Sequence, residues 1–214
     1  MNHPTWDYPL FEMLNFDGGA TLDSLMSAIS GIVMWIPLYL LILYMVWRRW
    51  SWRGVVALIL AVALALGLAD LLAGIFKHSG PLKDLWPDFP ARLRPMFSEG
   101  LSDVNIPSTN HGRYGTVSAH AATIVSLSII SAYAIHRRWF SWLITLVAIA
   151  ICYSRIYLAC HFPQDILLGA ALGVVTATLG ILVFRAIAGK NKRWQHKFLL
   201  CIIFSYTAKN IGNF

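Results

Sequence analysis

The sequence predicts an all-α protein: a polytopic transmembrane helical bundle of five or six spans, with an extramembrane loop between the second and third spans. Of its 214 residues, 57% are hydrophobic and only 13% are charged. Soluble domains carry about 45–50% apolar and about 25% charged residues, so a soluble fold of this length would lack polar surface. Five segments also approach the roughly 20 apolar residues that a helix needs to cross a membrane. We therefore expect one integral membrane domain that comprises residues 1–214.

The expected elements follow in chain order. An aromatic and apolar stretch from residue 6 to 16 predicts an interfacial helix before the first span. The spans are expected at about residues 25–47, 54–77, 116–135, 139–155 and 164–185. Residues 198–208 are apolar but too few to cross, so they are interpreted as an interfacial or packed C-terminal helix. The acidic N-terminus lacks the basic start of a cleavable signal peptide, and the first span is expected to act as an uncleaved insertion signal.

The formal net charge of +7 is explained by basic loops, and we do not expect nucleic acid as a partner. When five spans alternate, three basic segments fall on one side of the membrane: 48–53, 137–138 and 185–197. The positive-inside rule makes this side cytoplasmic. The N-terminus, the loop 78–115 and the short turn Tyr157–Pro163 then lie outside.

The loop 78–115 contains five prolines and cannot form one regular element. Its aromatic and apolar residues favour an ordered lid that lies on the membrane surface. Several basic residues stand on this outer side against the topological trend, namely Lys77, Arg92, Arg94, Arg113 and Arg155. Their position suggests a local function for the positive charge.

A helix is expected to begin near Ser118, because Gly112 and Gly115 interrupt regular structure and an apolar run follows. Thr116 or Ser118 is expected to be its N-cap. The free N–H groups of a first helical turn attract an anion such as phosphate, and His120 lies on that turn. A polar cap without a catalytic function is the alternative interpretation of His120.

The segment from Ser154 to Asp165 gives the most specific signal. Pro163 suits the first position of a helix. His161 and Asp165 are four residues apart, a spacing that lets two side chains meet across a helical turn. An Asp that accepts a hydrogen bond from one imidazole nitrogen leaves the other nitrogen free to attack. Arg155 adds a fork of donors that matches phosphate oxygens. A buried His–Asp pair that only ties two spans together is the alternative.

Two further sets of residues are candidates for a functional role or for a metal site. Asp70 lies within a span and shares a helix face with Lys77, so it is a candidate functional residue, with a role in holding helices together as an equal alternative. The three cysteines form neither a disulfide framework nor a zinc pattern. A metal site made by His120, His161 and Asp165 is disfavoured, because the nearby Arg and Lys residues would repel a cation.

These residues resemble the pattern of the type 2 phosphatidic acid phosphatase superfamily, the lipid phosphate phosphatases, in its bacterial membrane-integral branch. The third motif of that family is Ser-Arg, five residues, His, three residues, Asp, and residues 154–165 match it without deviation. The second motif, Pro-Ser-Gly-His, reads Val117-Ser118-Ala119-His120 here. The first motif is Lys, six residues, Arg-Pro. Arg94-Pro95 matches its end, and its lysine is Lys77 with an insertion or, alternatively, Lys83.

The resemblance implies a role for each of these residues. His161 is the nucleophile that forms a phosphohistidine, Asp165 orients it, and His120 is the general acid. The phosphoryl oxygens are held by Lys77, Arg94, Ser118, Ala119 and Arg155. Basic side chains then take the place of a metal ion, so no metal and no cofactor are expected. Because His161 must be neutral and His120 charged, a bell-shaped pH profile should follow.

The function expected from these features is hydrolysis of a membrane lipid phosphate or diphosphate, with undecaprenyl diphosphate as the first candidate substrate. Phosphatidylglycerol phosphate and lipid A 1-phosphate are the rivals, and Arg92, Asn110 and Arg113 are expected to read the headgroup. Transfer of the phosphate to another lipid and a non-enzymatic membrane protein are the alternatives. Gly169 and Gly173 predict close helix packing, inside the protein or at a dimer seam, so the oligomeric state stays open.

Overall fold

The computed structural model describes residues 4–99, 101, 104–107 and 112–189 of the chain. Within these residues the regular elements are helices, and the β-structure is one isolated antiparallel bridge between Leu93 and Tyr114. The prediction of an all-α membrane bundle is confirmed. The predicted C-terminal helix over residues 198–208 lies outside the described residues.

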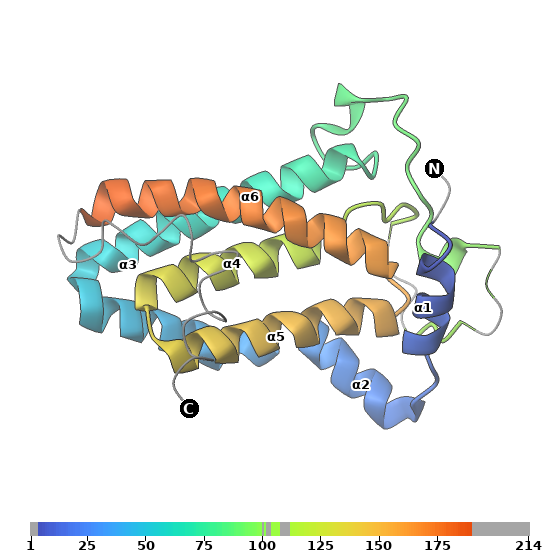
Figure 1. Cartoon of the computed structure of the whole chain (residues 1–214), viewed down its shortest axis with the longest axis horizontal. Helices are drawn as coiled ribbons and strands as arrows, with labels where there is room; N and C mark the ends of the chain where they lie inside the picture. The colour runs from blue at the N-terminus through green and yellow to red at the C-terminus, as the bar shows by residue number, and fades with distance from the viewer. Residues whose placement is uncertain (1–3, 100, 102–103, 108–111, 190–214) are drawn as a thin grey trace, which may run out of the picture.

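The first two predicted spans form the two arms of α3 (Ile36–Ile75), which bends at Ser51 with φ 63° and ψ −169°. Figure 1 shows the light-blue arm and the cyan arm both extending from this bend toward the other end of the bundle, so that the chain reverses its direction there. A Cβ atom at Gly54 would collide with the Trp50 side chain, so a glycine permits the close approach. The Trp50 indole donates to the carbonyl of Ala134 at 2.8 Å, which ties the bend to a neighbouring helix.

The predicted start of the first span at residue 25 is wrong. Instead, α2 (Gly19–Ser30) ends at Gly31, which has an extended backbone (φ −82°, ψ 158°), and the short 3₁₀ helix η1 (Val33–Trp35) leads into α3. Pro37 lies in the first turn of α3, where its missing N–H is tolerated. The apolar run hid this break, because hydropathy does not distinguish one long helix from two that meet at an angle.

The other three long helices are α4 (Ala119–Ile135), α5 (Arg138–Tyr157) and α6 (Pro163–Ala188). Three described helical stretches are long and apolar enough to cross a membrane: Val33–Ile75, α5 and α6. The apolar helix α4 is shorter, with 17 residues. It begins at Ala119 rather than at residue 116 because Ser118 is its N-cap and accepts a hydrogen bond from the N–H of Ala121 at 3.3 Å.

Helix α6 packs on α4 through small residues inside the chain. A Cβ atom at Gly173 would lie 2.6 Å from the Ala122 carbonyl oxygen, and one at Gly169 would collide with the Ser118 carbonyl. The hydroxyls of Ser126 and Thr176 also meet across these helices at 2.6 Å. The glycine spacing therefore serves internal packing, which is one of the two uses predicted.

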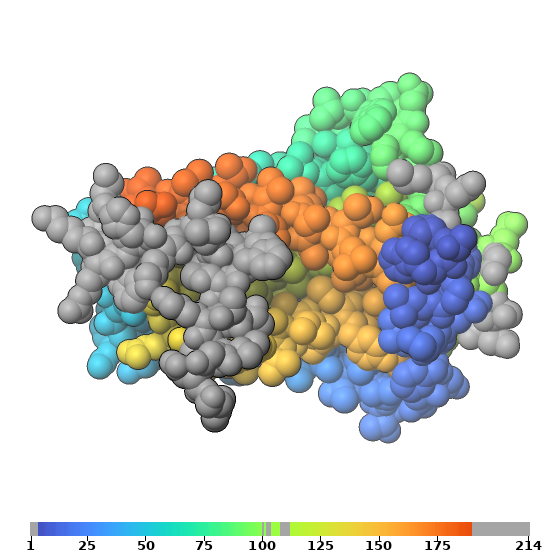
Figure 2. All heavy atoms as spheres, viewed as in Figure 1, coloured from blue at the N-terminus to red at the C-terminus, as the bar shows by residue number. Residues whose placement is uncertain are grey.

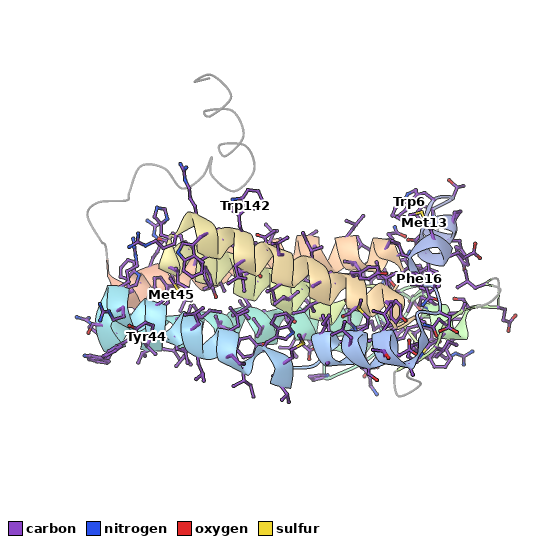
Figure 3. All side chains as sticks on the ribbon, turned by 90° about the horizontal axis from the view of Figure 1, so that it is seen from below. Trp6, Met13, Phe16, Tyr44, Met45 and Trp142 are labelled. Atoms are coloured by element: carbon purple, nitrogen blue, oxygen red, sulfur yellow. The ribbon has the colours of Figure 1, made fainter. Side chains whose placement is uncertain are left out.

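The two ends of the bundle differ in character (Figure 1). The bend of α3, the α4–α5 connection and the end of α6 lie together at one end, which carries the basic residues near positions 48–53, 137–138 and 185. The other end holds the loop that follows α3, the short turn between α5 and α6, and the N-terminal helix α1 (Asp7–Leu14). In Figure 3, Trp6, Met13 and Phe16 lie at this second end, whereas Tyr44, Met45 and Trp142 lie toward the first.

The described part of the loop after α3 contains short elements and no single long one, as its prolines predicted. It contains the 3₁₀ helices η2 (Lys83–Leu85) and η3 (Pro95–Phe97), besides the bridge between Leu93 and Tyr114. The rings of Phe76, Trp86 and Phe89 pack together, with centroids 5.1 to 6.4 Å apart. Figure 2 shows α1, in dark blue, against the start of α6, in orange.

Candidate active site

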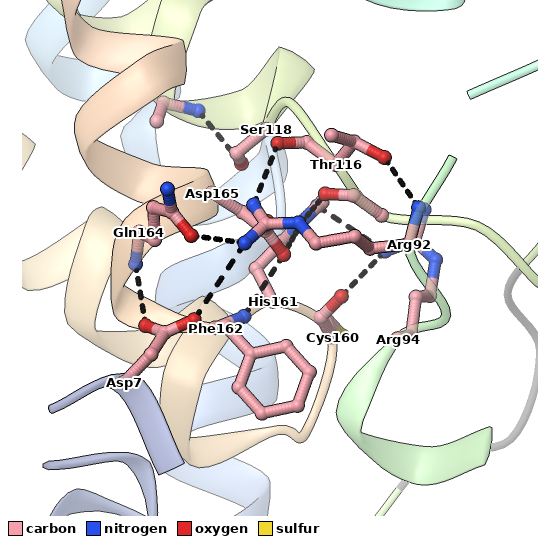
Figure 4. A network of polar contacts seen from close by, with 12 residues as sticks. Asp7, Arg92, Arg94, Thr116, Ser118, Cys160, His161, Phe162, Gln164 and Asp165 are labelled. Carbon is pink, nitrogen blue, oxygen red and sulfur yellow. Dashed lines mark hydrogen bonds and ion pairs between the residues drawn. The ribbon is translucent and has the colours of Figure 1, made fainter. Parts of the chain in front are cut away.

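The bridge in the long loop brings two arginines to the same place. The N–H of Arg94 donates to the carbonyl of Arg113 at 3.0 Å, and the N–H of Gly115 donates to the carbonyl of Arg92 at 2.9 Å. Side chains two residues apart on an extended segment point to the same face. Arg92 and Arg94 are accordingly both buried, with relative exposures of 3% and 9%, and both reach the turn between α5 and α6 (Figure 4).

That turn positions His161. The N–H groups of Cys160 and His161 donate to the carbonyl of Arg155 at 3.0 and 3.2 Å and so close the C-terminus of α5. Ala159 has a φ of 53°, in the left-handed region that most non-glycine residues avoid. Pro163 then starts α6 immediately, which leaves His161 buried between two helix ends.

The imidazole of His161 is held in one tautomer. Its Nδ1 lies 2.9 Å from the Gly115 carbonyl oxygen, and a carbonyl can only accept, so Nδ1 carries the hydrogen. Its Nε2 is then unprotonated and lies 3.2 Å from the Nη1 of Arg94. The Asp165 carboxylate is farther from Nδ1, at 3.5 Å. The nearest acceptor for the imidazole is thus a backbone carbonyl, although Asp165 was expected to orient it.

The surroundings keep His161 neutral. Burial lowers the pKa of His161 well below its usual range, and the positive charges of Arg94, Arg155 and Lys77 lower it further. Burial and the charge of Arg94 likewise lower the pKa of Lys77, which the charge of Asp70 opposes. Lys77 thus interacts electrostatically with Arg94 and His161. Lys83, the rival for the first motif, is exposed in η2.

The two arginines that were expected to bind phosphate, Arg94 and Arg155, lie near the turn between α5 and α6. Arg94 donates from Nε to the Gly112 carbonyl at 2.6 Å and from Nη1 to the Cys160 carbonyl at 2.8 Å. Arg155, which is 5% exposed, donates to the hydroxyl of Ser30. Within the described residues its buried Nε has no hydrogen-bond partner. Arg155 therefore keeps donor capacity beside His161.

Arg92, which was expected to read the headgroup, is buried and faces Asp165. Its guanidinium bonds the carboxylate of Asp165 and the side-chain oxygen of Gln164, and it donates to the Thr116 carbonyl at 3.3 Å. The hydroxyl of Thr116 in turn accepts from the Arg92 N–H at 2.8 Å. The second oxygen of Asp165 accepts from the N–H of Phe162 at 3.0 Å. Arg92 thus fixes Asp165, because a buried carboxylate requires a partner. Arg113 is exposed, and Asn110 lies outside the described residues.

The sequence profile of the PAP2 superfamily matches residues 54–188, more than half of the chain. The chain belongs to the PAP2 superfamily. It is 33% identical over 154 residues to the lipid A 4'-phosphatase of Bacteroides thetaiotaomicron, a match that covers 71% of this chain and 64% of that protein, less than two thirds of its length. It is 25% identical over 201 residues to the putative undecaprenyl-diphosphatase YbjG of Escherichia coli, covering 90% of each.

A solved structure has the same fold. The crystal structure of the first transmembrane PAP2 type phosphatidylglycerolphosphate phosphatase from Bacillus subtilis superimposes with a TM-score of 0.58 at 20% identity. The superposition covers 89% of this chain and 88% of that one. The PAP2 match includes all three motif segments, whereas α1, α2 and the first arm of α3 precede it.

The second motif of this PAP2 chain lies beside an apolar cavity. The N–H of Ser118 donates to the Asp165 carbonyl at 3.0 Å, which ties the start of α4 to the start of α6. Ala119 and the exposed His120 line a cavity of about 710 Å³ that extends between α2, α3, α4 and α5. Ser30 and Asp70 also line this cavity, whose remaining lining is mainly aliphatic and aromatic. Ser30 links the cavity to Arg155, so cavity and basic cluster are contiguous.

The sequence did not predict three features of the site. These are the Gly115 carbonyl as the acceptor for His161, the pairing of Arg92 with Asp165, and the position of Asp7 beside Arg92. A Cβ atom at Gly115 would lie 2.9 Å from the Cγ of Arg94 and 3.3 Å from the Nδ1 of His161, so only glycine fits there without movement. The glycine itself was the available signal, because a glycine between a proline-rich loop and a helix start often marks a close approach.

Proposed function

We propose that this protein is a phosphatase that hydrolyses a membrane lipid phosphate or diphosphate through a phosphohistidine at His161. The observation that carries the proposal is the arrangement around the imidazole. The Gly115 carbonyl takes the Nδ1 hydrogen at 2.9 Å, and Nε2 faces a cluster formed by Arg94, Arg155 and Lys77. A neutral imidazole surrounded by positive charge is suited to attack an anionic phosphorus centre.

In the first step, the lone pair of Nε2 forms a bond to phosphorus while the bond from phosphorus to the leaving oxygen breaks. His120 gives its proton to that oxygen. In the second step, water attacks the phosphohistidine, His120 takes a proton from the water, and inorganic phosphate is released. Arg94, Arg155 and Lys77 hold the equatorial oxygens, with Ser118 and the Ala119 N–H at the start of α4. No step uses a metal ion.

The apolar cavity supports a lipid substrate. It begins at His120 and runs between helices that face the membrane, and its walls can accept hydrocarbon chains while the phosphate stays at the basic cluster. The names of the relatives suggest two substrates for direct comparison. Undecaprenyl diphosphate is supported by a relative matched over 90% of its length, and lipid A by one with 33% identity. Phosphatidylglycerol phosphate is the third substrate to be tested.

The distribution of charge supports an active site on the periplasmic side of a bacterial inner membrane. The bend of α3, the α4–α5 connection and the end of α6, whose sequences include Arg48, Arg137 and Arg185, lie at the end of the bundle opposite the turn between α5 and α6 (Figure 1). The positive-inside rule assigns their end to the cytoplasm. Intact spheroplasts should then hydrolyse a substrate supplied from outside.

The test is release of inorganic phosphate from the three lipids by purified protein in detergent micelles. His161→Ala should abolish release, whereas His136→Ala, at the opposite end of the bundle, should retain it. Chelation of divalent metals should leave the wild-type rate unchanged. Adding alcohol or lipid acceptors and analysing the lipid products would separate hydrolysis from phosphotransfer. Phosphate release by His161→Ala at a rate near that of the wild type would contradict the proposal.

A further inference from the structure

Asp7 is the first residue of α1, yet it is fully buried and lies beside the active site. Its Oδ1 accepts a hydrogen bond from the N–H of Gln164 at 2.9 Å, in the first turn of α6. Its Oδ2 lies 3.8 Å from the Nη1 of Arg92. A carboxylate removed from water requires such partners, and the start of a helix favours negative charge. Asp7 therefore joins α1 to two elements of the site.

The contacts of Asp7 continue to the imidazole (Figure 4). The Nη1 of Arg92 faces Asp7 as an ion pair at 3.8 Å and donates to the side chain of Gln164, whereas its Nη2 bonds Asp165. Asp165 lies 3.5 Å from the Nδ1 of His161. The ion pairs thus run from Asp7 through Arg92 to Asp165, whose carboxylate lies beside the neutral imidazole of His161, and these four residues are all at most 3% exposed.

A second set of contacts fixes α1 next to His161. The rings of Tyr8 and Phe11 pack on Phe162, with centroids 5.1 and 5.2 Å away. The amide of Asn15, just after α1, donates to the Tyr157 carbonyl at 2.7 Å. Aromatic packing and this hydrogen bond hold α1 in place independently of Asp7. The Asp7 carboxylate is therefore not needed merely to attach α1 to the bundle.

We propose that Asp7 is a positioning residue for the reaction at His161, supplied by a helix that precedes the part of the chain matched by the family profile. Asp7 accepts from the Gln164 N–H and attracts the Nη1 of Arg92, so that Asp7 and Gln164 together hold one end of the guanidinium while the other end keeps Asp165 beside the imidazole. Without the charge of Asp7, Arg92 is free to shift toward Asp165 and to draw that carboxylate away from His161. The inference rests on the proposed function, since it concerns the same nucleophile.

The variant that tests this is Asp7→Asn, which keeps the size of the side chain and an oxygen for the Gln164 N–H. Because displacements of about 1 Å in an active site cost about 100-fold in rate, we expect kcat to fall about 10- to 100-fold. KM should not rise, and the thermal unfolding midpoint should stay close to that of the wild type. Asp7→Glu restores the charge and should recover part of kcat. Glu12→Gln, an exposed acid on the same helix, is the matched control and should behave as wild type.

The outcomes separate the two proposals. An inactive His161→Ala together with a wild-type kcat for folded Asp7→Asn would overturn the role of Asp7 and leave the proposed function intact. A lower yield of folded protein with an unchanged kcat per folded molecule would also overturn it, because that result describes structural stabilisation only. If Asp7→Asn is not recovered in folded form, Arg92→Lys decides, since lysine keeps the charge but lacks the planar fork of donors that faces Asp7 and Asp165 from its two ends. A wild-type kcat in Arg92→Lys would overturn the inference, and a loss of about tenfold or more would support it.

Discussion

The carbonyl of Gly115 offers a sharp test of the geometry at His161, because one methyl group should disturb it. In Gly115→Ala the new Cβ would lie 2.9 Å from Arg94 Cγ, 3.3 Å from His161 Nδ1 and 3.5 Å from Asp165 Oδ2. The first distance is shorter than carbon atoms tolerate, so something must move. Arg94 cannot move away easily, because it is buried and bonded to the carbonyls of Gly112 and Cys160.

The size of the effect follows from the energetics of overpacking. Inserting a methyl group into a well-packed site costs about 1–3 kcal/mol. If that cost falls on the catalytic arrangement, kcat/KM decreases about 5- to 150-fold. The amount of folded protein should change little, since the strain is confined to one turn and one loop. The assay is initial-rate release of inorganic phosphate from a lipid phosphate in mixed micelles, normalised to folded protein.

Gly112→Ala is the matched control in the same loop. A Cβ atom at Gly112 has no neighbour within 4 Å among the described atoms, and the carbonyl that Arg94 uses stays in place. We expect the wild-type rate from this variant. If Gly115→Ala also retained a rate within twofold of wild type while His161→Ala was inactive, the close packing around the nucleophile would not be required and our reading of the site would be refuted.

Two further predictions concern pH and stability. Burial and nearby positive charges lower the pKa of His161, so the neutral nucleophile persists at low pH, and the acid limb of the kcat/KM profile should lie below about pH 6.5, the ordinary pKa of histidine. Lys77→Met removes one of those positive charges and should move this acid limb to higher pH. An acid limb that does not move in Lys77→Met would exclude His161 as its origin. Gly173→Ala should lower the thermal unfolding midpoint because its Cβ would lie 2.6 Å from the Ala122 carbonyl oxygen, whereas Gly67→Ala, with open space around its Cβ, should maintain or raise it.

The part of the site that could be predicted from sequence is the part set by local spacing. His161 and Asp165 lie on either side of a helix start, so their proximity follows from a four-residue separation. The small residues of α6 predicted close packing for the same reason. The apolar segments likewise predicted the spans, since hydrophobic length is a property of each segment alone. The break at Gly31 was missed because hydropathy is unchanged across it.

The remaining features depend on contacts between distant segments. The acceptor of His161 is a backbone carbonyl 46 residues away, and a backbone group carries no residue-specific signal. The first motif identified Arg94, which faces the imidazole, but no motif indicated that Arg92 pairs with the carboxylate of Asp165. Asp7 lies 157 residues from Gln164, and an acid near an N-terminus is ordinarily solvated. Only the folded arrangement distinguishes these residues from their neighbours.

The charge balance around His161 allows the effect of Asp7 on charge to be distinguished from its effect on geometry. The described side chains around the site include four cations (Lys77, Arg92, Arg94 and Arg155) and two carboxylates (Asp7 and Asp165). Even with Asp70, which acts on Lys77, the four cations leave the site net positive, which suits the charge of about −2 on a phosphate monoester. Asp7→Asn would increase this net charge and, by electrostatics alone, should tighten binding of the anion. A positioning role predicts instead that kcat falls. A variant with slower turnover and an equal or lower KM would therefore show that the loss comes from geometry, because the change in charge acts in the opposite direction.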